Sequence, residues 1–237
     1  MSKILITGAA GFIGSQLAHA LWQQGNEVVL VDDFSYGQED NLVFTDHDFR
    51  QEILRADICN RDFMYSLCEE QKFDFIYHIA AVTPLPDCQT DPAGAVAVNV
   101  AGAVNVLEAA RRFMRGGAGK VVFASTSAVY ENCRVFPCRE EDAVPPSLIY
   151  SSGKYAAEQF CKSYADVYGM NVTVLRFANV YGPHIDCLRK QPPVAGYMIR
   201  ELYYDRAPVL HSDGKQKRDF IYVEDLIDLA LRVQEGT

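Results

Sequence analysis

The segment TGAAGFIG, residues 7–14, decides the fold. It follows a short apolar run at 3–6, and the helical pattern of apolar residues behind it stops at Gly25. A second apolar run spans 27–31 and ends in an acidic pair at 32–33. A strand, a glycine-rich loop, a helix, a strand and an acidic residue in this order predict one βαβ unit.

The alternation of strands and helices continues along the chain. Further strands are predicted at 53–58, 73–81, 120–125, 172–177 and 218–223, and helices at 61–70, 93–113, 151–168, 194–205 and 224–234. Most strand segments are apolar runs without strict alternation, which is typical of parallel sheets covered by helices on both faces. We therefore predict an α/β protein with a Rossmann-type doubly wound parallel sheet.

Composition and charge argue against several classes of protein. The 237 residues are 49% apolar and 22% charged, a globular balance, and the net charge of −9 disfavours nucleic acid or an anionic membrane as partner. No apolar run is expected to be long enough to cross a bilayer. The seven cysteines are irregularly spaced, which predicts free thiols in a reducing cytoplasm and no metal site. A disulfide between Cys133 and Cys138 stays open as an alternative.

The glycine-rich loop has the features of a dinucleotide site. Gly8 permits the tight turn after the strand, Gly11 lets the backbone approach a pyrophosphate, and Gly14 lets the helix pack closely. The N-terminus of the helix offers free N–H groups to the phosphates. Asp32, eighteen positions after Gly14, is suited to the ribose hydroxyls of NAD and would repel the 2′-phosphate of NADP. The alternative is a structural turn in which Asp32 is a capping residue.

The segment YSSGK, residues 150–154, places a phenol and an ammonium one helical turn apart. A free phenol has a pKa near 10, so a phenolate at pH 7 costs about 4 kcal/mol. An exposed ion pair supplies only about 0–1 kcal/mol. Tyr150 therefore acts as a base only if Lys154 is desolvated and the oxidised nicotinamide adds a second positive charge. Ser127 would complete the arrangement; the alternative is an exposed tyrosine at a helix start.

Motifs along the whole chain then match one family. In sequence order they are TGAAGFIG (7–14), DI (57–58), HIAA (78–81), NVAG (99–102), STSAVY (125–130), YSSGK (150–154), RFANVYGP (176–183) and RDFIYVED (218–225). The chain resembles the extended short-chain dehydrogenases/reductases, in their NAD-dependent nucleotide-sugar epimerase/dehydratase branch. This resemblance is specific for the family and much less so for the substrate.

The resemblance implies a role for each matching position. Tyr150 would be the catalytic base, Lys154 its partner, and Ser127 the hydroxyl bonded to the substrate oxygen. Cofactor contacts are expected from Gly8, Gly11, Phe12, Ile13, Gly14, Asp32, Asp33, Asp57, Ile58, Ala80, Ala81, Asn99, Tyr150, Lys154 and Phe177. Substrate contacts are expected from Thr126, Ser127, Tyr150, Asn179 and Arg218. Asn179 and Arg218 would hold the nucleotide diphosphate, although a solvated charge run is the alternative for Arg218.

The family chemistry predicts that Tyr150 removes a hydroxyl proton while a hydride passes to NAD, which leaves a transient keto-sugar. Dehydratases of the family then use an Asp-Glu pair, and decarboxylases a Glu, at positions where this chain has Ser127-Ala128. We therefore predict epimerisation of a nucleotide-diphosphate sugar, at C4. The alternatives are another oxidoreductase, dehydratase or decarboxylase of the family, and a non-catalytic NAD-binding module.

The last part of the chain departs from the family pattern. Residues 183–217 hold prolines, basic residues and one helical pattern, and we expect them to form part of a small, incomplete C-terminal substrate lobe. The NAD-binding Rossmann domain is predicted to consist of 1–182, with 218–237 returning to it. Family members continue beyond Thr237, and the sugar-selecting residues lie in this region, so the sequence does not identify the sugar.

Three further features bear on the site and on assembly. Glu131 stands where relatives have Gly, and we expect it to reshape the loop beside the active site. The helices predicted at 93–113 and 151–168 carry more apolar residues than one core face needs. The matching helices of the family form a dimer interface, so we expect a homodimer. His78 is interpreted as a hydrogen-bonded structural residue, because nothing nearby completes a metal site.

Overall fold

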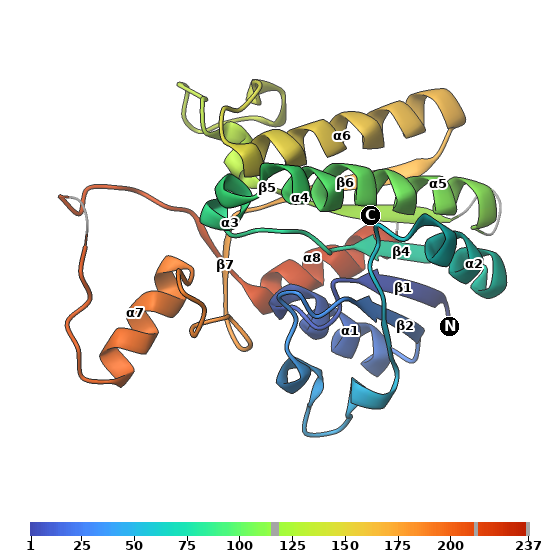
Figure 1. Ribbon diagram of the computed structural model, residues 1–237, viewed down its shortest axis with the longest axis horizontal. Helices are drawn as coiled ribbons and strands as arrows, with labels where there is room; N and C mark the ends of the chain where they lie inside the picture. Colours follow the sequence, from blue (N-terminus) through green and yellow to red (C-terminus); the bar gives the residue numbers. More distant parts are fainter. Residues whose placement is uncertain (115–118, 211–212, 236–237) are drawn as a thin grey trace.

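The computed structural model describes residues 1–237 except 115–118, 211–212 and 236–237. At its centre lies a six-stranded parallel sheet in the order β3-β2-β1-β4-β5-β6 (Figure 1). The strands are β1 (Lys3–Thr7), β2 (Glu27–Asp32), β3 (Ile53–Arg55), β4 (Phe75–His78), β5 (Lys120–Thr126) and β6 (Asn171–Phe177). This is the Rossmann strand order, in which the direction of winding reverses between β1 and β4. The predicted fold class is confirmed.

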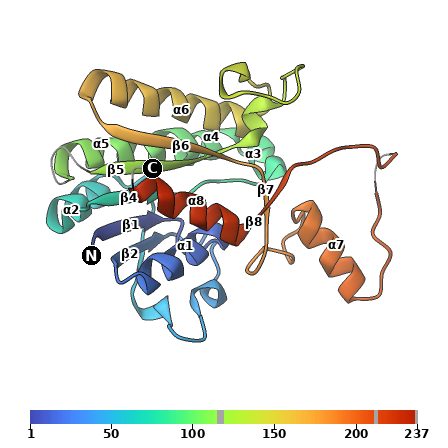
Figure 2. The ribbon, with the colours of Figure 1, turned by 180° about the vertical axis from the view of Figure 1, so that it is seen from behind.

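Helices cover both faces of the sheet (Figures 1 and 2). In the described part of the chain they are α1 (Phe12–Gln23), α2 (Arg61–Gln71), α3 (Leu85–Thr90), α4 (Pro92–Val96), α5 (Ala103–Phe113), α6 (Ile149–Tyr168), α7 (Val194–Tyr203) and α8 (Val223–Glu235). Helices α1 and α8 pack together on one face, and α2, α5 and α6 on the other. Strand β1 packs against both helix layers. Ile4 and Ile6 face the layer of α1 and α8, and Leu5 faces the layer of α2, α5 and α6.

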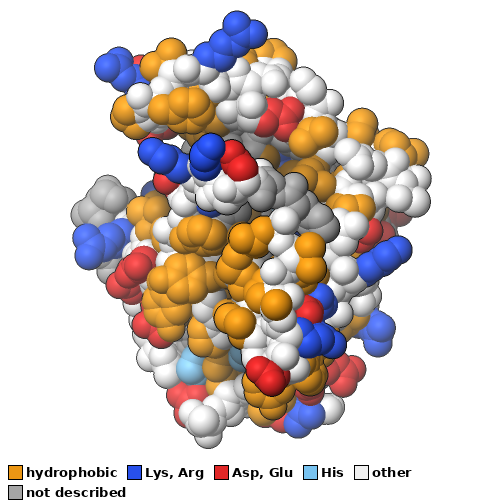
Figure 3. Space-filling view, turned by 90° about the vertical axis from the view of Figure 1, so that its left-hand side faces the viewer, with side chains coloured by type: hydrophobic (Ala, Val, Ile, Leu, Met, Phe, Trp, Pro, Cys, Tyr) orange, Lys and Arg blue, Asp and Glu red, His pale blue; other side chains and the backbone are white. Residues whose placement is uncertain are grey.

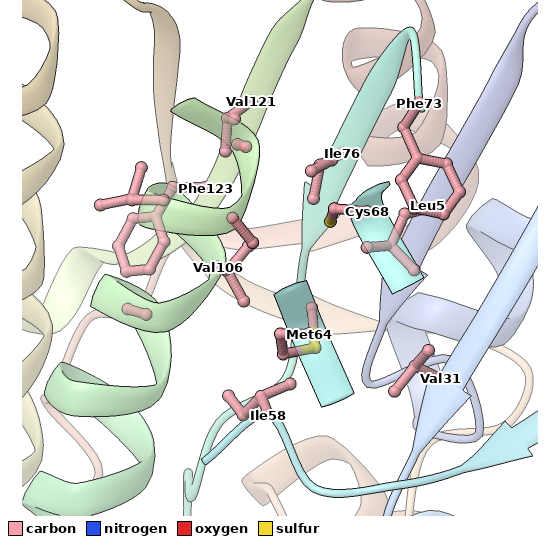
Figure 4. Close-up of a cluster of buried hydrophobic side chains, with 14 of the residues drawn as sticks. Leu5, Val31, Ile58, Met64, Cys68, Phe73, Ile76, Val106, Val121 and Phe123 are labelled. Atoms are coloured by element: carbon pink, nitrogen blue, oxygen red, sulfur yellow. The ribbon is translucent and has the colours of Figure 1, made fainter. Parts of the chain in front are cut away.

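Figure 4 shows the core between the sheet and the second helix layer. Leu5 and Ile76 of the strands meet Met64 and Cys68 of α2 and Val106 of α5, and all five side chains are fully buried. Burying one large aliphatic side chain contributes about 1.5–3 kcal/mol. A strand that is buried on both faces explains why the strand segments lack alternation in the sequence.

One expected helix is interrupted. The helix predicted at 93–113 is formed by α4, a π-helical segment (Ala97–Gly102) and α5. The interruption lies at Asn99, whose side chain accepts a hydrogen bond from the N–H of Val82 at 2.8 Å and donates to its carbonyl oxygen at 2.9 Å. Such π-bulges are frequent beside functional sites. The periodicity of the sequence does not predict this contact, because Asn99 and Val82 lie on different elements.

The C-terminal part forms a second, smaller sheet. Strand β7 (Asn179–Tyr181) pairs in parallel with β8 (Phe220–Tyr222), outside the main sheet. Helix α7 lies between these two strands in sequence and stands away from the sheet in Figure 1. Only Gly196 of α7 is buried. After β8 the chain enters α8, whose Leu226 and Ile227 are buried against the sheet.

The helical stretch Pro92–Phe113 differs from the expectation that no apolar segment would be long enough to cross a membrane. By length and composition it is long enough, with a mean hydropathy of 1.5 over an 18-residue window. In that window 44% of the residues are buried inside the protein, and α5 packs against α2 and α6. Core helices of soluble proteins pass the same test. The absence of a membrane partner stays a prediction.

Candidate active site

A cavity of about 1600 Å³ opens at the carboxyl ends of the strands, and residues of the small C-terminal segment line its far side. Ligands of doubly wound sheets bind at this edge, where the winding reverses. The predicted site residues that line the cavity are Gly8, Gly11, Phe12, Ile13, Gly14, Asp32, Asp33, Asp57, Ile58, Ala80, Ala81, Thr126, Ser127, Tyr150, Lys154, Phe177, Asn179 and Arg218. Asn99 alone is missing from this set. Individual contacts of these residues with ligands stay predictions.

The glycine loop has the close backbone packing that a pyrophosphate cradle needs. Gly8 has a φ of 73°, and a Cβ there would lie 2.6 Å from the backbone nitrogen of Ala80. A Cβ on Gly14 would lie 2.1 Å from the carbonyl oxygen of Gly8. Helix α1 starts after Gly11 without a side-chain cap and without an acidic residue in its first turn. Its N–H groups therefore face the cavity without competition, as phosphate binding requires.

Asp32 lies at the end of β2 and is buried. One carboxylate oxygen accepts a hydrogen bond from the N–H of Ala10 at 2.9 Å, and the other from the N–H of Phe34 at 2.8 Å. Burial raises the pKa of Asp32, and these two hydrogen bonds oppose the change. Each carboxylate oxygen keeps a free lone pair for a ligand hydroxyl. The capping role and the ribose-binding role, posed as alternatives, are compatible in this geometry.

Two short turns, after β2 and after β3, line one part of the cavity. The carboxylate of Asp33 accepts hydrogen bonds from the N–H and the hydroxyl of Ser35, at 2.9 and 2.7 Å. The carboxylate of Asp57 accepts one from the N–H of Cys59 at 2.8 Å. Ile58 is buried and fills the space that Gly102 leaves, where a Cβ would lie 2.7 Å from its Cδ1. These turns hold a partly apolar wall suited to a flat base.

Asn99 corrects one expectation. It was predicted to lie along the cofactor, yet its side chain is 3% exposed and is bonded to the backbone of Val82. Val82 itself lines the cavity, together with Ala80 and Ala81. Asn99 therefore contributes to the cavity indirectly, because its hydrogen bonds hold the segment after β4 in place. A sequence motif marks the position but not the direction in which the amide points.

Lys154 is buried in α6, one turn after Tyr150. Its Nζ donates a hydrogen bond to the carbonyl oxygen of Ala124 at 2.8 Å and lies 4.8 Å from the centre of the Phe123 ring. Desolvation lowers the pKa of Lys154 to about 8. The ammonium is thus desolvated, as predicted. The hydrogen bond that the structure shows for it, within the described residues, leads to β5 and not to the phenol.

The pKa of the Tyr150 phenol is raised, whereas a phenol that acts as a base at neutral pH needs a lowered pKa. Burial raises its pKa, and a hydrogen bond with the Thr126 side chain only partly opposes this. The hydroxyl of Thr126 also accepts a hydrogen bond from the N–H of Ala128 at 3.1 Å, which caps the short 3-10 turn Ser127–Tyr130. Without a cofactor charge, the phenol is therefore protonated at neutral pH. This agrees with the expectation that Tyr150 and Lys154 do not suffice.

The substrate side carries more positive charge than the sequence motifs indicated. Arg218 lines the cavity, and the amide of Asn179 donates to the carbonyl oxygen of Asp219 at 2.9 Å. Arg189 and Lys217 also line the cavity and were not predicted. The Nε of Arg189 donates to the carbonyl oxygen of Gln191 at 2.8 Å, and the charge of Arg189 lowers the pKa of Tyr150. Only their basic character could have marked these residues in the sequence.

His78 has a structural environment. It is 2% exposed, its Nδ1 lies 2.7 Å from the hydroxyl oxygen of Thr7, and its ring lies against Phe123. Desolvation lowers the pKa of His78 to about 3, so the ring is neutral. It does not line the cavity. The interpretation as a hydrogen-bonded structural histidine agrees with these contacts.

A Rossmann sheet that presents a tyrosine and a lysine one helical turn apart beside a dinucleotide crevice is the arrangement of the short-chain dehydrogenases/reductases. Within this class, the chain belongs to the NAD dependent epimerase/dehydratase family, whose family model matches residues 4–236. The family consists of enzymes, and their cofactor is NAD. The glycine loop and Asp32 fit that cofactor in this chain.

Relatives with curated names include epimerases and decarboxylases. The UDP-glucose 4-epimerase of Mycolicibacterium smegmatis is 35% identical over 231 residues, which are 97% of this chain and 72% of that protein. The UDP-glucuronic acid decarboxylase 1 of Xenopus tropicalis is 32% identical over 231 residues, which are 95% of this chain and 52% of that protein. The chain thus spans about half the length of the decarboxylase.

Solved structures show the same architecture. The UDP-glucose 4-epimerase of Thermotoga maritima, solved with UDP-glucose, superposes with a TM-score of 0.89 at 29% identity, over 98% of this chain and 72% of that chain. The UDP-N-acetylglucosamine 4-epimerase of Methanobrevibacter ruminantium superposes with a TM-score of 0.90 at 28% identity, over 99% and 73% of the two chains. Both are 4-epimerases of nucleotide sugars.

Proposed function

We propose that this protein is an NAD-dependent 4-epimerase of a nucleotide-diphosphate sugar. The observation that carries the proposal is the chemistry at Ser127 and Ala128, which line the cavity beside Tyr150 and bear no carboxylate. Elimination of water requires an acid and a base beside the keto-sugar. Glu131 is the nearest acidic residue in sequence, and its carboxylate already accepts three hydrogen bonds. Oxidation followed by return of the hydride needs no such pair.

Bound NAD would supply the hydride acceptor and, after the sugar has turned, the hydride donor. Tyr150 would take the hydroxyl proton and later give it back, because its phenol lies at the start of α6 beside the cavity. Ser127 would hold the substrate oxygen. Lys154 carries three N–H donors and uses one on Ala124, so two are left for the ribose and the phenolate. Its charge would stabilise the phenolate in this buried setting.

The size of the cavity supports a site that holds two ligands at once. About 1600 Å³ exceeds the roughly 300–1000 Å³ of a site for one small ligand, so a dinucleotide and a nucleotide sugar fit together. Arg189, Lys217 and Arg218 line the half that is remote from the glycine loop. Asp186 and Asp219 line the cavity beside them, but the three cations outnumber these two carboxylates, and in a protein with a net charge of −9 this favours the diphosphate of the substrate.

The test is incubation of the NAD-loaded protein with UDP-glucose, UDP-N-acetylglucosamine, UDP-glucuronate and the dTDP, GDP and CDP analogues. We expect a 4-epimer of one of them, identified by NMR of the product. Release of CO2 from UDP-glucuronate would establish the decarboxylase alternative, and loss of water the dehydratase alternative. If NAD binds and no sugar is converted, the protein is a non-catalytic NAD-binding module.

We also propose that the protein is a cytoplasmic homodimer. Its seven cysteines are all free, which suits a reducing compartment. On α6, Phe160, Val167 and Tyr168 are 41%, 70% and 55% exposed, and apolar side chains on one helix face favour a partner. Light scattering after size-exclusion chromatography should give twice the mass of 26.5 kDa. A monomer at micromolar concentration would contradict this assembly.

A further inference from the structure

Glu131 connects the two elements that carry the predicted catalytic residues. Ser127 lies in the 3-10 turn that ends at Tyr130, and Glu131 is the next residue. The Glu131 carboxylate reaches across to the segment before α6. It accepts hydrogen bonds from the N–H of Ser147, the N–H of Leu148 at 2.9 Å and the hydroxyl of Ser151 at 2.7 Å. These bonds span 16 to 20 positions of the chain.

Asn132 strengthens the same connection. Its side-chain amide donates to the carbonyl oxygen of Pro145 and to the hydroxyl of Ser147, both at 3.1 Å. Two adjacent residues therefore hold the chain from 145 to 151, and Tyr150 lies within this range. The residue before Glu131 is also held, because the hydroxyl of Tyr130 accepts a hydrogen bond from Nη1 of Arg176 at 2.7 Å.

The start of α6 needs such a partner. Its N-cap residue is Leu148, which has no polar side chain, and the first turn contains no acidic residue. A helix start normally uses a Ser, Thr, Asp or Asn side chain at this position, and a negative charge near it is favourable. Burial alone would raise the pKa of Glu131, but its three hydrogen bonds lower it, so the carboxylate is ionised at neutral pH. Glu131 binds the N–H groups of Ser147 and Leu148, just before the first helical residue, and so places beside the helix start the negative charge that its own first turn lacks.

We propose that Glu131, supported by Asn132, is a positioning residue that sets the place of the Tyr150 phenol relative to the Ser127 hydroxyl. The expected effect of Glu131 on turnover rests on the proposed function. Its effect on the start of α6 rests on the hydrogen bonds alone. A shift of about 1 Å between reacting groups costs up to about 100-fold in rate.

Three variants test the inference: Glu131→Ala, Glu131→Gln and, as a matched control, Glu141→Gln. Glu141 lies in the same loop, its side chain is 69% exposed, and its ion pair with Arg139 is long, at 3.8 Å. For Glu131→Ala we expect kcat to fall about 10- to 100-fold, while KM changes less than about threefold. Glu131→Gln keeps one carbonyl oxygen as acceptor and should lie between Glu131→Ala and the unmodified protein. The control should be unchanged.

Amide hydrogen exchange gives a readout that does not depend on turnover. Peptides covering 146–152 should exchange faster in Glu131→Ala and unchanged in the control, and bound NAD should stay at the same stoichiometry. Unchanged kcat in Glu131→Ala, or a loss of kcat with unchanged exchange at 146–152, would overturn the inference. If the unmodified protein converts no sugar, the proposed function fails, and the exchange experiment alone decides whether Glu131 holds the start of α6.

Discussion

The six-stranded sheet and the segment around α7 differ in how they are held. In the sheet, β1, β4 and β5 are buried on both faces, and their apolar side chains are almost fully enclosed. In α7 the only buried residue is Gly196, whereas Leu202 and Tyr203 are 66% and 81% exposed. Figure 3 looks at the side on which α7 lies, and hydrophobic side chains are spread over the middle of this face.

This contrast implies different roles for two parts of the cavity. The cofactor half is lined by the glycine loop and Asp32, and the substrate half by Arg189, Lys217 and Arg218. The cofactor half is built on a packed core, so its glycine loop and Asp32 are in place before any ligand arrives. The substrate half has little core of its own, and Arg189, Lys217 and Arg218 stand on irregular backbone. Segments with few buried contacts open at low free-energy cost. Substrate binding should therefore order this half and leave the cofactor half unchanged.

The largest effect is expected at the junction of the two halves. Tyr150→Phe removes the proton-transfer group and should lower kcat by up to about 10⁴-fold, because general acid–base catalysis contributes about 10²–10⁴. NAD binding should change little, since the glycine loop and Asp32 are untouched. Turnover assays and NAD stoichiometry check this. A variant that keeps normal turnover would remove Tyr150 from the mechanism.

A matched pair of leucines compares the two regions directly. Leu107 in α5 is 2% exposed, and Leu202 in α7 is 66% exposed. Leu107→Ala should lower the free energy of unfolding by about 2–5 kcal/mol, because it leaves a cavity in the core. Leu202→Ala should change it by less than about 0.5 kcal/mol. Urea denaturation measures both values. An equal loss in Leu202→Ala would show that α7 contributes a core of its own.

We expect the buried ammonium of Lys154, which the proposed function needs, to lower the free energy of unfolding of the ligand-free protein. Its pKa of about 8 in the folded protein lies below the unfolded value of 10.5. Between these values the unfolded chain binds more protons, so the stability of the ligand-free protein should rise as the pH rises from about 8 to about 10.5. Lys154→Met should abolish this rise and add about 1–3 kcal/mol at pH 7, with turnover lost.

The control is Lys162→Met on the same helix. The Lys162 side chain is 69% exposed, so this substitution should change the free energy of unfolding by less than about 0.5 kcal/mol. Chemical denaturation across pH 7 to 10.5 gives the free energies of unfolding. A loss of stability in Lys154→Met at pH 7 would mean that its hydrogen bond to Ala124 outweighs the desolvation of its charge.

The smallest effect is expected in the substrate half. Arg189→Ala should raise KM for the nucleotide sugar about five- to tenfold, or about 1 kcal/mol, because one partly screened cation is lost from the wall. NAD affinity should stay the same. Arg206→Ala is the control, since this exposed arginine pairs with Glu201 and does not line the cavity. A change in NAD affinity in Arg189→Ala would place this residue in the cofactor half instead.

The sequence predicted the elements of the sheet more accurately than those around it. Strands β1 and β2, the glycine loop and Asp32 lie within one short stretch, so local pattern alone marks them. The pairing of β7 with β8 was not predicted, because it joins residues that are about forty positions apart and outside the main sheet. The interruption at Asn99 was missed for the same reason, since its cause is the backbone of Val82.

The sequence by itself determined the Rossmann-type alternation, the cofactor and the family, because periodicity and glycine spacing are local properties and the order of the motifs can be read along the chain without knowing which segments are in contact. Only the tertiary structure decided how the site is held. It bonds Lys154 to the carbonyl oxygen of Ala124, joins the Asn99 side chain to the backbone of Val82, and brings Glu131 to the start of α6. Each of these facts is a contact between distant segments. Such contacts depend on how the elements pack, and no local pattern of residues encodes them.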